Sequence, residues 1–380
     1  MLRSLIIYFT AVLVFSGCFN IVILSPVTIR VELQTTPLDT DEHIFMSGNL
    51  PQLGGWSATG LPFSQISDTK WIAEFKVKTG SSIEFKITRG SWNLEAMTEK
   101  CIVPGNSALI ANQDTTIIIE IPRWKDDCAA AGGGITGEVR YHEDFASQHL
   151  TLPRDIIVWL PPGYTEDERY PVLYMHDGQN IFDPLTSYIG QDWKVDEVAT
   201  QLISENKMKK IIVVGIYCTE LRGPEYSPMQ LGEKYTQFLI QELKPFIDSH
   251  YPTLRDSSNT AVMGSSMGGI ISFHIAWENP HVFSMAGCLS PAFMVDDNEI
   301  LERVNTYTGN KKPIKFYLDN GTVGLEAELA PGFEQMCRLL PQKGYTEDDL
   351  LVYVDDGAVH NEIAWANRIH IPLLFFFGTE

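Results

Sequence analysis

Cysteine and basic side chains are scarce in this sequence, and it contains no repeat or low-complexity tract. Its 380 residues include six cysteines, and 28 Lys and Arg stand against 48 Asp and Glu, a formal net charge of −20. With no basic stripe to offset it, this charge repels nucleic-acid phosphates and anionic membrane surfaces. The sequence therefore indicates no nucleic-acid partner and favours a neutral substrate. Without a repeat, nothing indicates a solenoid.

The cysteines form no metal-binding motif. There is no C-x-x-C pair and no clustering of cysteine with histidine at the spacing of a zinc site, so we expect no metal. A disulfide between Cys101 and Cys128 remains open. Cys218 and Cys288 lie in apolar, strand-like runs, which favours small buried side chains for both.

The first 18 residues, "MLRSLIIYFTAVLVFSGC", have the features of an export signal. One positive charge precedes an apolar stretch, and small residues precede Cys18. This segment resembles a bacterial lipoprotein signal, in which Cys18 would be lipidated and become the mature N-terminus. The alternative is an uncleaved anchor, because apolar character continues through "FNIVILSPVTI". Either interpretation predicts an exported, membrane-anchored protein, at the outer membrane or cell surface or in the periplasm.

The clearest boundary within the chain is "DDCAAAGGGITG", residues 126–137. Three alanines followed by three glycines are typical of a flexible linker, which we assign to residues 125–136. Before it, residues 28–124 contain short alternating runs, such as "VTIRVELQ" and "WIAEFKVK", separated by turn residues. This pattern predicts a small all-β sandwich of the immunoglobulin-like, antiparallel kind.

Residues 137–380 follow a different pattern. Apolar runs such as "YPVLYMHD", "KIIVVGIY" and "NTAVMGSS" are separated by longer segments, among which 231–249 and 327–343 have helical periodicity. This alternation predicts a mostly parallel sheet with helices on both faces.

The run "GSSMG", residues 264–268, matches the G-x-S-x-G turn that carries the nucleophile of α/β-hydrolases. This register places Ser266 at the centre of the motif and Ser265 at its variable position. Glycines are needed there because the nucleophile occupies a strained turn in which neighbouring Cβ atoms would clash. The next residues predict a helix facing Ser266, and the N–H of Met267 can bind an oxyanion. The alternative is a small-residue turn that only packs a helix onto a strand.

An α/β-hydrolase requires the order serine, acid, histidine along the chain. His360 follows the strand-like run "LLVYVDDG" and begins the loop before the last helix, so it can act as the general base. His370 lies in a helix-like run and is interpreted as structural. For the acid we prefer Glu326, in the loop after "IKFYLDNGT", with Asp319 and Glu328 as the alternatives.

A second oxyanion donor is expected in the loop after the third strand. In "YMHDGQNIFD", residues 174–183, Gly178 permits an unusual backbone and the N–H of Gln179 is the predicted donor. The structural alternative, which is compatible with that role, is a polar turn closed by Asp177 and Asn180.

Residues 137 to about 378 resemble the putative-esterase family of α/β-hydrolases, which includes feruloyl and acetyl-xylan esterases, enterochelin-esterase-like enzymes and mycolyltransferases. The resemblance is carried, in order, by "PPGY", "YPVLYMHDGQNIFD", "IIVVGI", "RGPEYSP", "GSSMGG", "LDNGT" and "DDGAVHNEIAW". It implies Ser266 as nucleophile and His360 as base, and it places the acid a few residues beyond "GT", which favours Glu326. Segments that flank the family's pocket match four residues of this chain, interpreted as substrate-lining: Trp193, Arg222, Glu225 and Tyr226. Trp193 is equally well explained as a core residue.

Residues 28–124 resemble a starch-binding-type carbohydrate-binding module, through "MSGNLPQLGGW", "DTKWIAEF" and "FKITRGSW". The resemblance implies a sugar site of two aromatic rings and a lysine, which would be Trp56, Lys86 and Trp92. Flat indole faces suit the apolar faces of sugar rings, and the ammonium group can donate to a hydroxyl. Trp71 is expected in the core. Alternatively, this module only shapes a neighbouring active site.

Together these features predict an exported serine carboxylesterase that needs no cofactor. Its substrate would be an ester on a carbohydrate, such as a hydroxycinnamate or acetyl decoration of a polysaccharide, and its sandwich would bind an α-glucan or another glycan. Two other functions stay open: a glycan-binding surface lipoprotein whose hydrolase body is idle, and an esterase of a siderophore trilactone.

Overall fold

A computed structural model describes residues 26–38, 42–99, 104–129 and 134–379. It divides the chain into two compact units, which are described separately. The smaller unit comprises residues 1–90 and 106–120, and the larger unit comprises residues 91–105 and 121–380. The predicted signal segment with Cys18, and Cys101 of the open disulfide, lie outside the described residues. None of the described helices is both long and apolar enough to cross a bilayer.

The smaller unit consists of two four-stranded sheets with the strand orders β4-β5-β1-β9 and β3-β2-β6-β8. The alternating sequence explains their burial: in β1, Ile29, Val31 and Leu33 are at most 1% exposed, whereas the residues between them are more accessible. Trp71 is buried in the core, as predicted. This arrangement is the sandwich-like, β-rich architecture that the sequence predicts. The elements of this unit are β1 (Val27–Thr35), β2 (Phe45–Gly48), η1 (Pro51–Leu53), β3 (Leu61–Pro62), β4 (Ser64–Ser67), β5 (Lys70–Val77), β6 (Ser81–Thr88), β8 (Ser107–Ala111) and β9 (Thr115–Ile121).

Short elements precede the main sheet of the larger unit. They are η2 (Trp92–Leu94), β7 (Ala96–Met97), β10 (Arg123–Trp124) and α1 (Lys125–Ala129). The linker predicted at 125–136 therefore begins with a helical turn. The start of α1 is stabilised because the Trp124 N–H donates to Asp127 Oδ2 over 3.0 Å.

The main sheet of the larger unit has eight strands in the order β11-β12-β14-β13-β15-β16-β17-β18. The β11–β12 and β12–β14 pairs are antiparallel, and every pair from β14–β13 to β17–β18 is parallel. The mostly parallel sheet that the sequence predicts is therefore present. Its strands are β11 (Glu138–Phe145), β12 (Arg154–Leu160), β13 (Val172–His176), β14 (Ile212–Ile216), β15 (Thr260–Ser265), β16 (Met285–Leu289), β17 (Lys315–Asn320) and β18 (Leu350–Val354).

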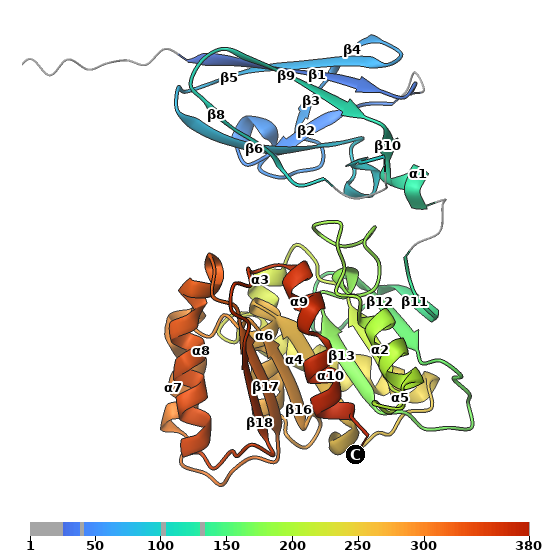
Figure 1. Cartoon of the computed structure of the whole chain (residues 1–380), viewed down its shortest axis with the longest axis vertical. Helices are drawn as coiled ribbons and strands as arrows, with labels where there is room; N and C mark the ends of the chain where they lie inside the picture. The colour runs from blue at the N-terminus through green and yellow to red at the C-terminus, as the bar shows by residue number, and fades with distance from the viewer. Residues whose placement is uncertain (1–25, 39–41, 100–103, 130–133, 380) are drawn as a thin grey trace, which may run out of the picture. The chain divides into compact units, whose positions relative to one another are not determined.

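Helices cover both faces of this sheet (Figure 1). One face packs against α4 to α8 through a core that includes Tyr235, Phe273 and Phe333, and the other packs against α2, α9 and α10 through Trp365 and Phe377. The helical periodicity at 231–249 and 327–343 corresponds to α4–η4–α5 and to α8. The bounds are η3 (Gly178–Asn180), α2 (Val195–Ser204), α3 (Arg222–Glu225), α4 (Gly232–Phe238), η4 (Leu239–Leu243, a π-helical segment), α5 (Lys244–His250), η5 (Ser257–Asn259), α6 (Met267–Glu278), α7 (Val295–Thr306), α8 (Leu325–Gln342), α9 (Glu362–Arg368) and α10 (His370–Phe377).

This topology gathers the predicted site residues at one edge of the sheet. The carboxyl ends of parallel strands lie at the same edge, and the loops that leave them form the usual site of α/β proteins. Gln179 follows β13, Ser266 follows β15, Glu326 follows β17 and His360 follows β18.

Candidate active site

Ser266 occupies the turn between β15 and α6 in a strained conformation, with φ 55° and ψ −118°. A non-glycine residue held in such a region costs on the order of 1–3 kcal/mol, and residues of this kind cluster at functional sites. Gly264 is required, because a Cβ there would lie 2.8 Å from the carbonyl oxygen of Gly268. The strained turn that the motif predicts is therefore present.

Backbone hydrogen bonds fix Ser266 against the next strand. The Ser266 N–H donates to the carbonyl of Leu289 over 2.9 Å, and the Ser266 carbonyl accepts from the N–H of Ala292 over 3.1 Å. Ser265, in contrast, is only 3% exposed at the end of β15. Of the two adjacent serines, Ser266 is therefore the more accessible.

His360 pairs with one of the three candidate acids. Its Nδ1 lies 3.1 Å from Oε1 of Glu326. Asp319 is fully buried and instead accepts hydrogen bonds from Tyr317 and Arg368. Glu328 and His370 are both exposed. Glu326 is thus the one candidate acid in contact with His360.

Glu326 is fully buried and held as a carboxylate by several donors. Burial by itself would raise the pKa of Glu326, but hydrogen bonds from His360, Ser290 and the Gly321 N–H outweigh it, so the pKa is lowered. The hydroxyl of Ser290 donates to Oε1 over 2.6 Å, and the Gly321 N–H donates to Oε2 over 2.9 Å. Glycine is required at 321, because a Cβ there would lie 2.5 Å from the carbonyl oxygen of Ala358.

A second layer of side chains, which the sequence analysis missed, holds Ser290 itself. Its hydroxyl accepts hydrogen bonds from Trp365 Nε1 at 3.0 Å and from Arg368 Nη2 at 2.8 Å. The ring of His360 also packs edge-on against Trp365, with centroids 5.0 Å apart. Trp365 and Arg368 are three residues apart on α9 and therefore share a face. That spacing, just after the candidate histidine, is a signal that sequence reasoning could have used.

Ser266 and His360 are both tied to the carboxyl end of β16 and the residue after it. Ser266 bonds to Leu289 through its backbone, while Ser290 binds the acid that holds His360. Within the described part of the chain, no hydrogen bond joins the Ser266 hydroxyl to His360. Catalytic hydrogen bonds often reach their final length only when substrate binds.

Two backbone donors at this edge have no acceptor among the described residues: the N–H of Met267, the first residue of α6, and the N–H of Gln179, within η3. Gly178 allows η3 to approach β14, because a Cβ there would lie 2.5 Å from the carbonyl carbon of Gly215. The polar turn that the sequence suggests also forms, since the Asn180 N–H donates to the Asp177 carbonyl over 2.8 Å.

Arg222 and Tyr226 anchor the turn that carries Gln179. The guanidinium of Arg222 donates two bonds to Asp177, Nε to Oδ1 at 2.7 Å and Nη2 to Oδ2 at 2.8 Å. The hydroxyl of Tyr226 accepts from the Asp177 N–H at 3.2 Å, and Asp177 itself is left-handed with φ 56°. Burial opposes the charge of Arg222, but the carboxylate of Asp177 raises its pKa.

Three of the four predicted pocket-lining residues are buried instead. Trp193 is 1% exposed, and Glu225 and Tyr226 are 0% exposed, so in this structure they offer no surface to a substrate. Glu225 forms a buried ion pair with Arg154, and Trp193 packs on Trp365 with ring centroids 5.4 Å apart. This corrects the lining role that the resemblance implied: these side chains support the loops of the site. The Arg222 side chain is 33% exposed.

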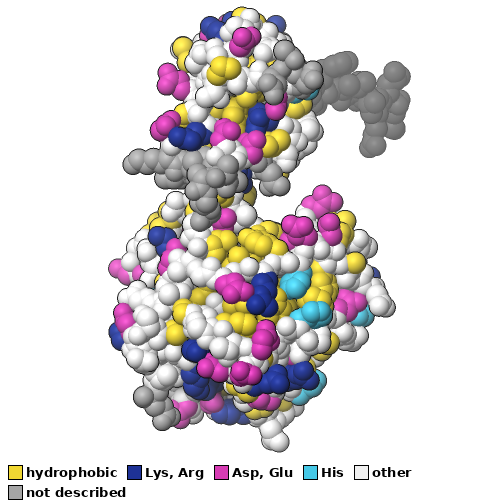
Figure 2. Space-filling view, turned by 90° about the vertical axis from the view of Figure 1, so that its right-hand side faces the viewer, with side chains coloured by type: hydrophobic (Ala, Val, Ile, Leu, Met, Phe, Trp, Pro, Cys, Tyr) yellow, Lys and Arg dark blue, Asp and Glu magenta, His cyan; other side chains and the backbone are white. Residues whose placement is uncertain are grey.

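Exposed apolar side chains flank the acid and the histidine along the chain. Val323 and Leu325 precede Glu326, and Val359 and Ile363 surround His360; each of the four is 41–48% exposed. On the face of the larger unit that Figure 2 shows, hydrophobic side chains gather beside histidine side chains. Glu326 lies in the first turn of α8, not in the loop that the sequence predicts. This turn and the segment around His360 therefore present an apolar surface.

The predicted sugar-binding residues fall in both units. In the smaller unit, Trp56 is 36% exposed in a left-handed conformation, and Lys86 lies opposite Ser47 in the β6–β2 pair. Trp92 is half-buried and belongs to the larger unit. That these three residues share one surface stays a prediction.

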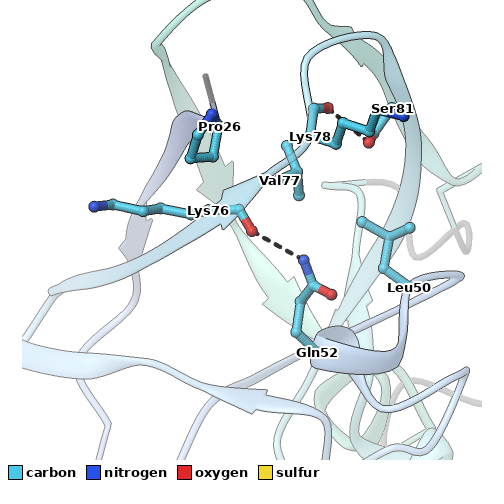
Figure 3. A pocket seen from close by; sticks show the side chains of 7 residues that line it. All are labelled: Pro26, Leu50, Gln52, Lys76, Val77, Lys78 and Ser81. Atoms are coloured by element: carbon cyan, nitrogen blue, oxygen red, sulfur yellow. Dashed lines mark hydrogen bonds between the residues drawn. The ribbon is translucent and has the colours of Figure 1, made fainter. Parts of the chain in front are cut away.

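A hollow of about 400 Å³ on the smaller unit contains none of these three residues. It is crossed by a hydrogen bond from Gln52 Nε2 to the Lys76 carbonyl over 3.1 Å (Figure 3). Its lining residues are Pro26, Leu50, Gln52, Lys76, Val77, Lys78 and Ser81.

The mostly parallel sheet and the strained serine at its carboxyl edge define a hydrolase fold of the esterase kind. Residues 147–368 match the model of the family described as "Putative esterase", and the chain belongs to this family. Residues 25–107 match the model described as "Starch binding domain". Both resemblances that the sequence suggested are confirmed.

Individual relatives and solved structures agree with this assignment. The chain is 21% identical to the uncharacterized protein YbbA of Bacillus subtilis over 62% of this chain and 96% of that protein. It is 28% identical to an endo-1,4-beta-xylanase/feruloyl esterase of Xylanibacter ruminicola over 65% of this chain but only 32% of that protein. A ferulic acid esterase structure is similar with a TM-score of 0.53 at 19% identity, covering 63% of this chain and 98% of that chain. Enterochelin esterase from Shigella flexneri gives a TM-score of 0.55 at 16% identity, covering 88% and 87%. At 16–19% identity, the similarity to these two solved structures shows a shared fold and nothing more.

Proposed function

We propose that this protein is a serine carboxylesterase in which Ser266 is the nucleophile, His360 the general base and Glu326 the residue that orients the histidine. The observation that carries the proposal is the buried Glu326 carboxylate at 3.1 Å from Nδ1 of His360, at the same sheet edge as the strained Ser266. Perturbed, buried acids paired to a histidine beside such a serine are typical of catalytic sites.

The acid fixes which nitrogen of His360 carries the proton. A carboxylate only accepts hydrogen bonds, so Nδ1 must donate to Glu326 and Nε2 keeps its lone pair. Nε2 can then take the proton of Ser266 as Oγ attacks the ester carbonyl carbon. The new bond between Oγ and carbon places a negative charge on the carbonyl oxygen.

The N–H groups of Met267 and Gln179 are proposed to bind that oxyanion, since both lack an acceptor among the described residues. Electrostatic stabilisation of this kind is usually the largest catalytic contribution. His360 next protonates the leaving alkoxide, which departs as the alcohol. A water molecule, deprotonated by His360, then attacks the acyl-serine, releases the acid and restores Ser266.

For the substrate, we propose an ester between a bulky apolar acid, such as a hydroxycinnamate, and a carbohydrate. The exposed Val323, Leu325, Val359 and Ile363 favour an apolar acyl group over acetate. The starch-binding-type module and the feruloyl esterase relative support a carbohydrate alcohol. An export signal at residues 1–18 would bring the enzyme to such polymers outside the cytoplasm, and the module would hold it on a glycan.

A siderophore trilactone is the second candidate substrate. The observation in its favour is coverage: the enterochelin esterase structure covers 88% of this chain, whereas the ferulic acid esterase structure covers 63%. A catecholate trilactone is also a bulky aromatic ester, so the apolar loops suit it as well.

The proposal is tested with Ser266→Ala and the matched control Ser265→Ala. We expect wild type and Ser265→Ala to be labelled by a fluorophosphonate probe and to hydrolyse at least one of the feruloyl, acetyl, aliphatic and catechoyl-trilactone esters. Ser266→Ala should lose labelling and about 10⁶-fold in kcat. Feruloyl turnover would identify the first substrate class, and trilactone turnover the second. A wild type that is neither labelled nor active on any of these esters would contradict the proposal and leave an idle, glycan-binding protein.

A further inference from the structure

Three carboxylates gather at the start of α2, and none of them is among the residues assigned to ester hydrolysis. Asp192, Asp196 and Glu197 each contribute an oxygen, and these oxygens all lie within 4.8 Å of one another. None of the ion pairs formed by the described residues includes any of the three. Lys194, which lies between them in the sequence, is exposed.

The cluster is buried and incompletely satisfied. Asp196 is 0% exposed and Asp192 is 4% exposed. Oδ2 of Asp196 accepts from the Thr136 N–H, but its Oδ1 has no hydrogen-bond partner, and neither has the buried Oε2 of Glu197. A buried carboxylate oxygen without a donor is costly, and neighbouring carboxylates without a cation repel one another. Either a proton shared between the carboxyl groups or a bound cation is needed to neutralise them.

We propose that Asp192, Asp196 and Glu197 bind a divalent cation, and that this cation is Ca²⁺. All donors are oxygens, with no thiolate or imidazole, which selects a hard cation rather than zinc or copper. Three carboxylates can supply up to six oxygens in the irregular arrangement that Ca²⁺ tolerates. Mg²⁺ requires a near-ideal octahedron and keeps several waters, which suits a buried cluster less well. The expectation of no metal followed from the absence of cysteine and histidine at zinc-site spacing, which does not test for a site made of carboxylates.

The position of the cluster gives the cation a structural role. Asp196 joins the N-terminus of α2 to Thr136, which leads into the first strand of the large sheet. Val195 and Ala199 of the same helix are fully buried in the core. The cation would bind the folded protein and not the unfolded chain. Binding would therefore hold the segment before β11 against α2 and raise the stability of the larger unit.

The test uses the full chain, stripped with EDTA and then titrated with CaCl₂ or MgCl₂. We expect heat of binding for CaCl₂ by calorimetry, weaker binding of MgCl₂, and a melting temperature about 2–4 °C higher in CaCl₂ than in EDTA. Asp196→Asn and Glu197→Gln should weaken CaCl₂ binding at least about tenfold and remove the thermal shift. Glu347→Gln, an exposed acid in another loop, is the control and should bind like wild type.

Two results would overturn the proposal. One is a wild type that shows neither heat nor a thermal shift with CaCl₂. In that case, an EDTA-stripped Asp196→Asn that is more stable than wild type would show that the carboxyl groups share a proton. The other is CaCl₂ binding that survives both Asp196→Asn and Glu197→Gln. If Asp196→Asn does not fold, Asp192→Asn and Glu197→Gln serve in its place. Neither result bears on ester hydrolysis, which uses other residues.

Discussion

The two units carry their candidate functional side chains in opposite ways. In the larger unit, Glu326 is fully buried and accepts hydrogen bonds from His360, Ser290 and Gly321. In the smaller unit, Trp56 is 36% exposed and stands on a left-handed backbone beside two glycines. One site is fixed by buried polar partners, and the other presents an aromatic ring to solvent.

The difference follows from what each site has to do. Acyl transfer needs groups oriented before the substrate arrives, because reorientation during the reaction would raise the barrier. Stacking on a sugar needs an accessible flat face and little polar support. We therefore expect single substitutions to have large effects in the larger unit and small effects in the smaller unit.

Glu326→Gln should produce the largest of these effects apart from loss of the nucleophile. The amide nitrogen of glutamine can donate toward Nδ1, which favours the tautomer protonated on Nε2 and removes the base. By analogy with the corresponding change in serine proteases, we expect kcat to fall by about 10⁴-fold. Steady-state kinetics on a soluble aryl ester measure this effect.

Glu328→Gln is the matched control, because this exposed glutamate lies two residues away on the same helix. It should retain wild-type kcat. Equal losses in Glu326→Gln and Glu328→Gln, or activity kept by Glu326→Gln, would remove Glu326 from the proposed triad.

Acid should destabilise the larger unit more than the smaller unit, because the larger unit contains a fully buried histidine, His176. Burial lowers the pKa of His176 to about 3, and His176 is fully buried with Nδ1 at 2.9 Å from the Tyr235 hydroxyl. Between pH 3 and about 6.5 the folded state therefore binds fewer protons than the unfolded state. Stability is fully present above pH 6.5 and is lost as the pH falls, by about 3 kcal/mol at pH 4.5 from His176 alone. His43 of the smaller unit is exposed.

Urea unfolding at pH 7 and pH 4.5 measures this loss separately in wild type and His176→Gln. The variant should lose less stability between the two pH values, because glutamine does not titrate. The transition of the larger unit should move to lower urea at pH 4.5, while that of the smaller unit stays nearer its position at pH 7. The same pH dependence in wild type and His176→Gln would show that His176 is not the group responsible.

Arg222→Gln should have a moderate effect, because Arg222 acts through the turn that carries Gln179. Loss of the two bonds to Asp177 would leave that carboxylate buried and free the proposed oxyanion donor to move. We expect kcat to fall by about 10–100-fold with little change in KM, and partial recovery in Arg222→Lys.

Arg169→Gln, at an exposed position, is the control and should leave both parameters unchanged. A rise in KM without a fall in kcat would instead assign Arg222 to substrate binding, as its 33% exposure would also allow.

The fold of the larger unit was predictable because its signals are local. Buried parallel strands are continuous apolar runs, and α4–η4–α5 and α8 have helical periodicity, so their types and order follow from the sequence. The strained turn at Ser266 was predictable as well, because its glycines are adjacent in the chain. The short helix α1 was not predicted, since the alanine- and glycine-rich run that follows Asp127 dominated the interpretation of that segment.

The support of the site was not predictable from the same signals. Ser290 and Arg368 are 78 residues apart and meet only through the folded sheet. An aromatic or acidic residue near a family motif gives no indication of whether it faces substrate or core, and Trp193, Glu225 and Tyr226 face the core. The carboxylate cluster at α2 was not predicted for a related reason: Asp192, Asp196 and Glu197 are ordinary surface residue types until burial removes their water.

Trp56→Ala is the smallest of the expected effects and the most direct test of the smaller unit. Loss of one stacking face should weaken retention on granular starch by about tenfold. Ile66→Ala, which removes an exposed apolar side chain of the same unit (59% exposed), should retain wild-type binding. Hydrolysis of a soluble aryl ester should be unchanged in both variants, since Trp56 belongs to the smaller unit. Failure of wild type to bind starch would contradict α-glucan binding by the module. If Trp56→Ala lowers kcat on the soluble ester, the module acts by shaping the active site, and the contrast between the two units would no longer hold.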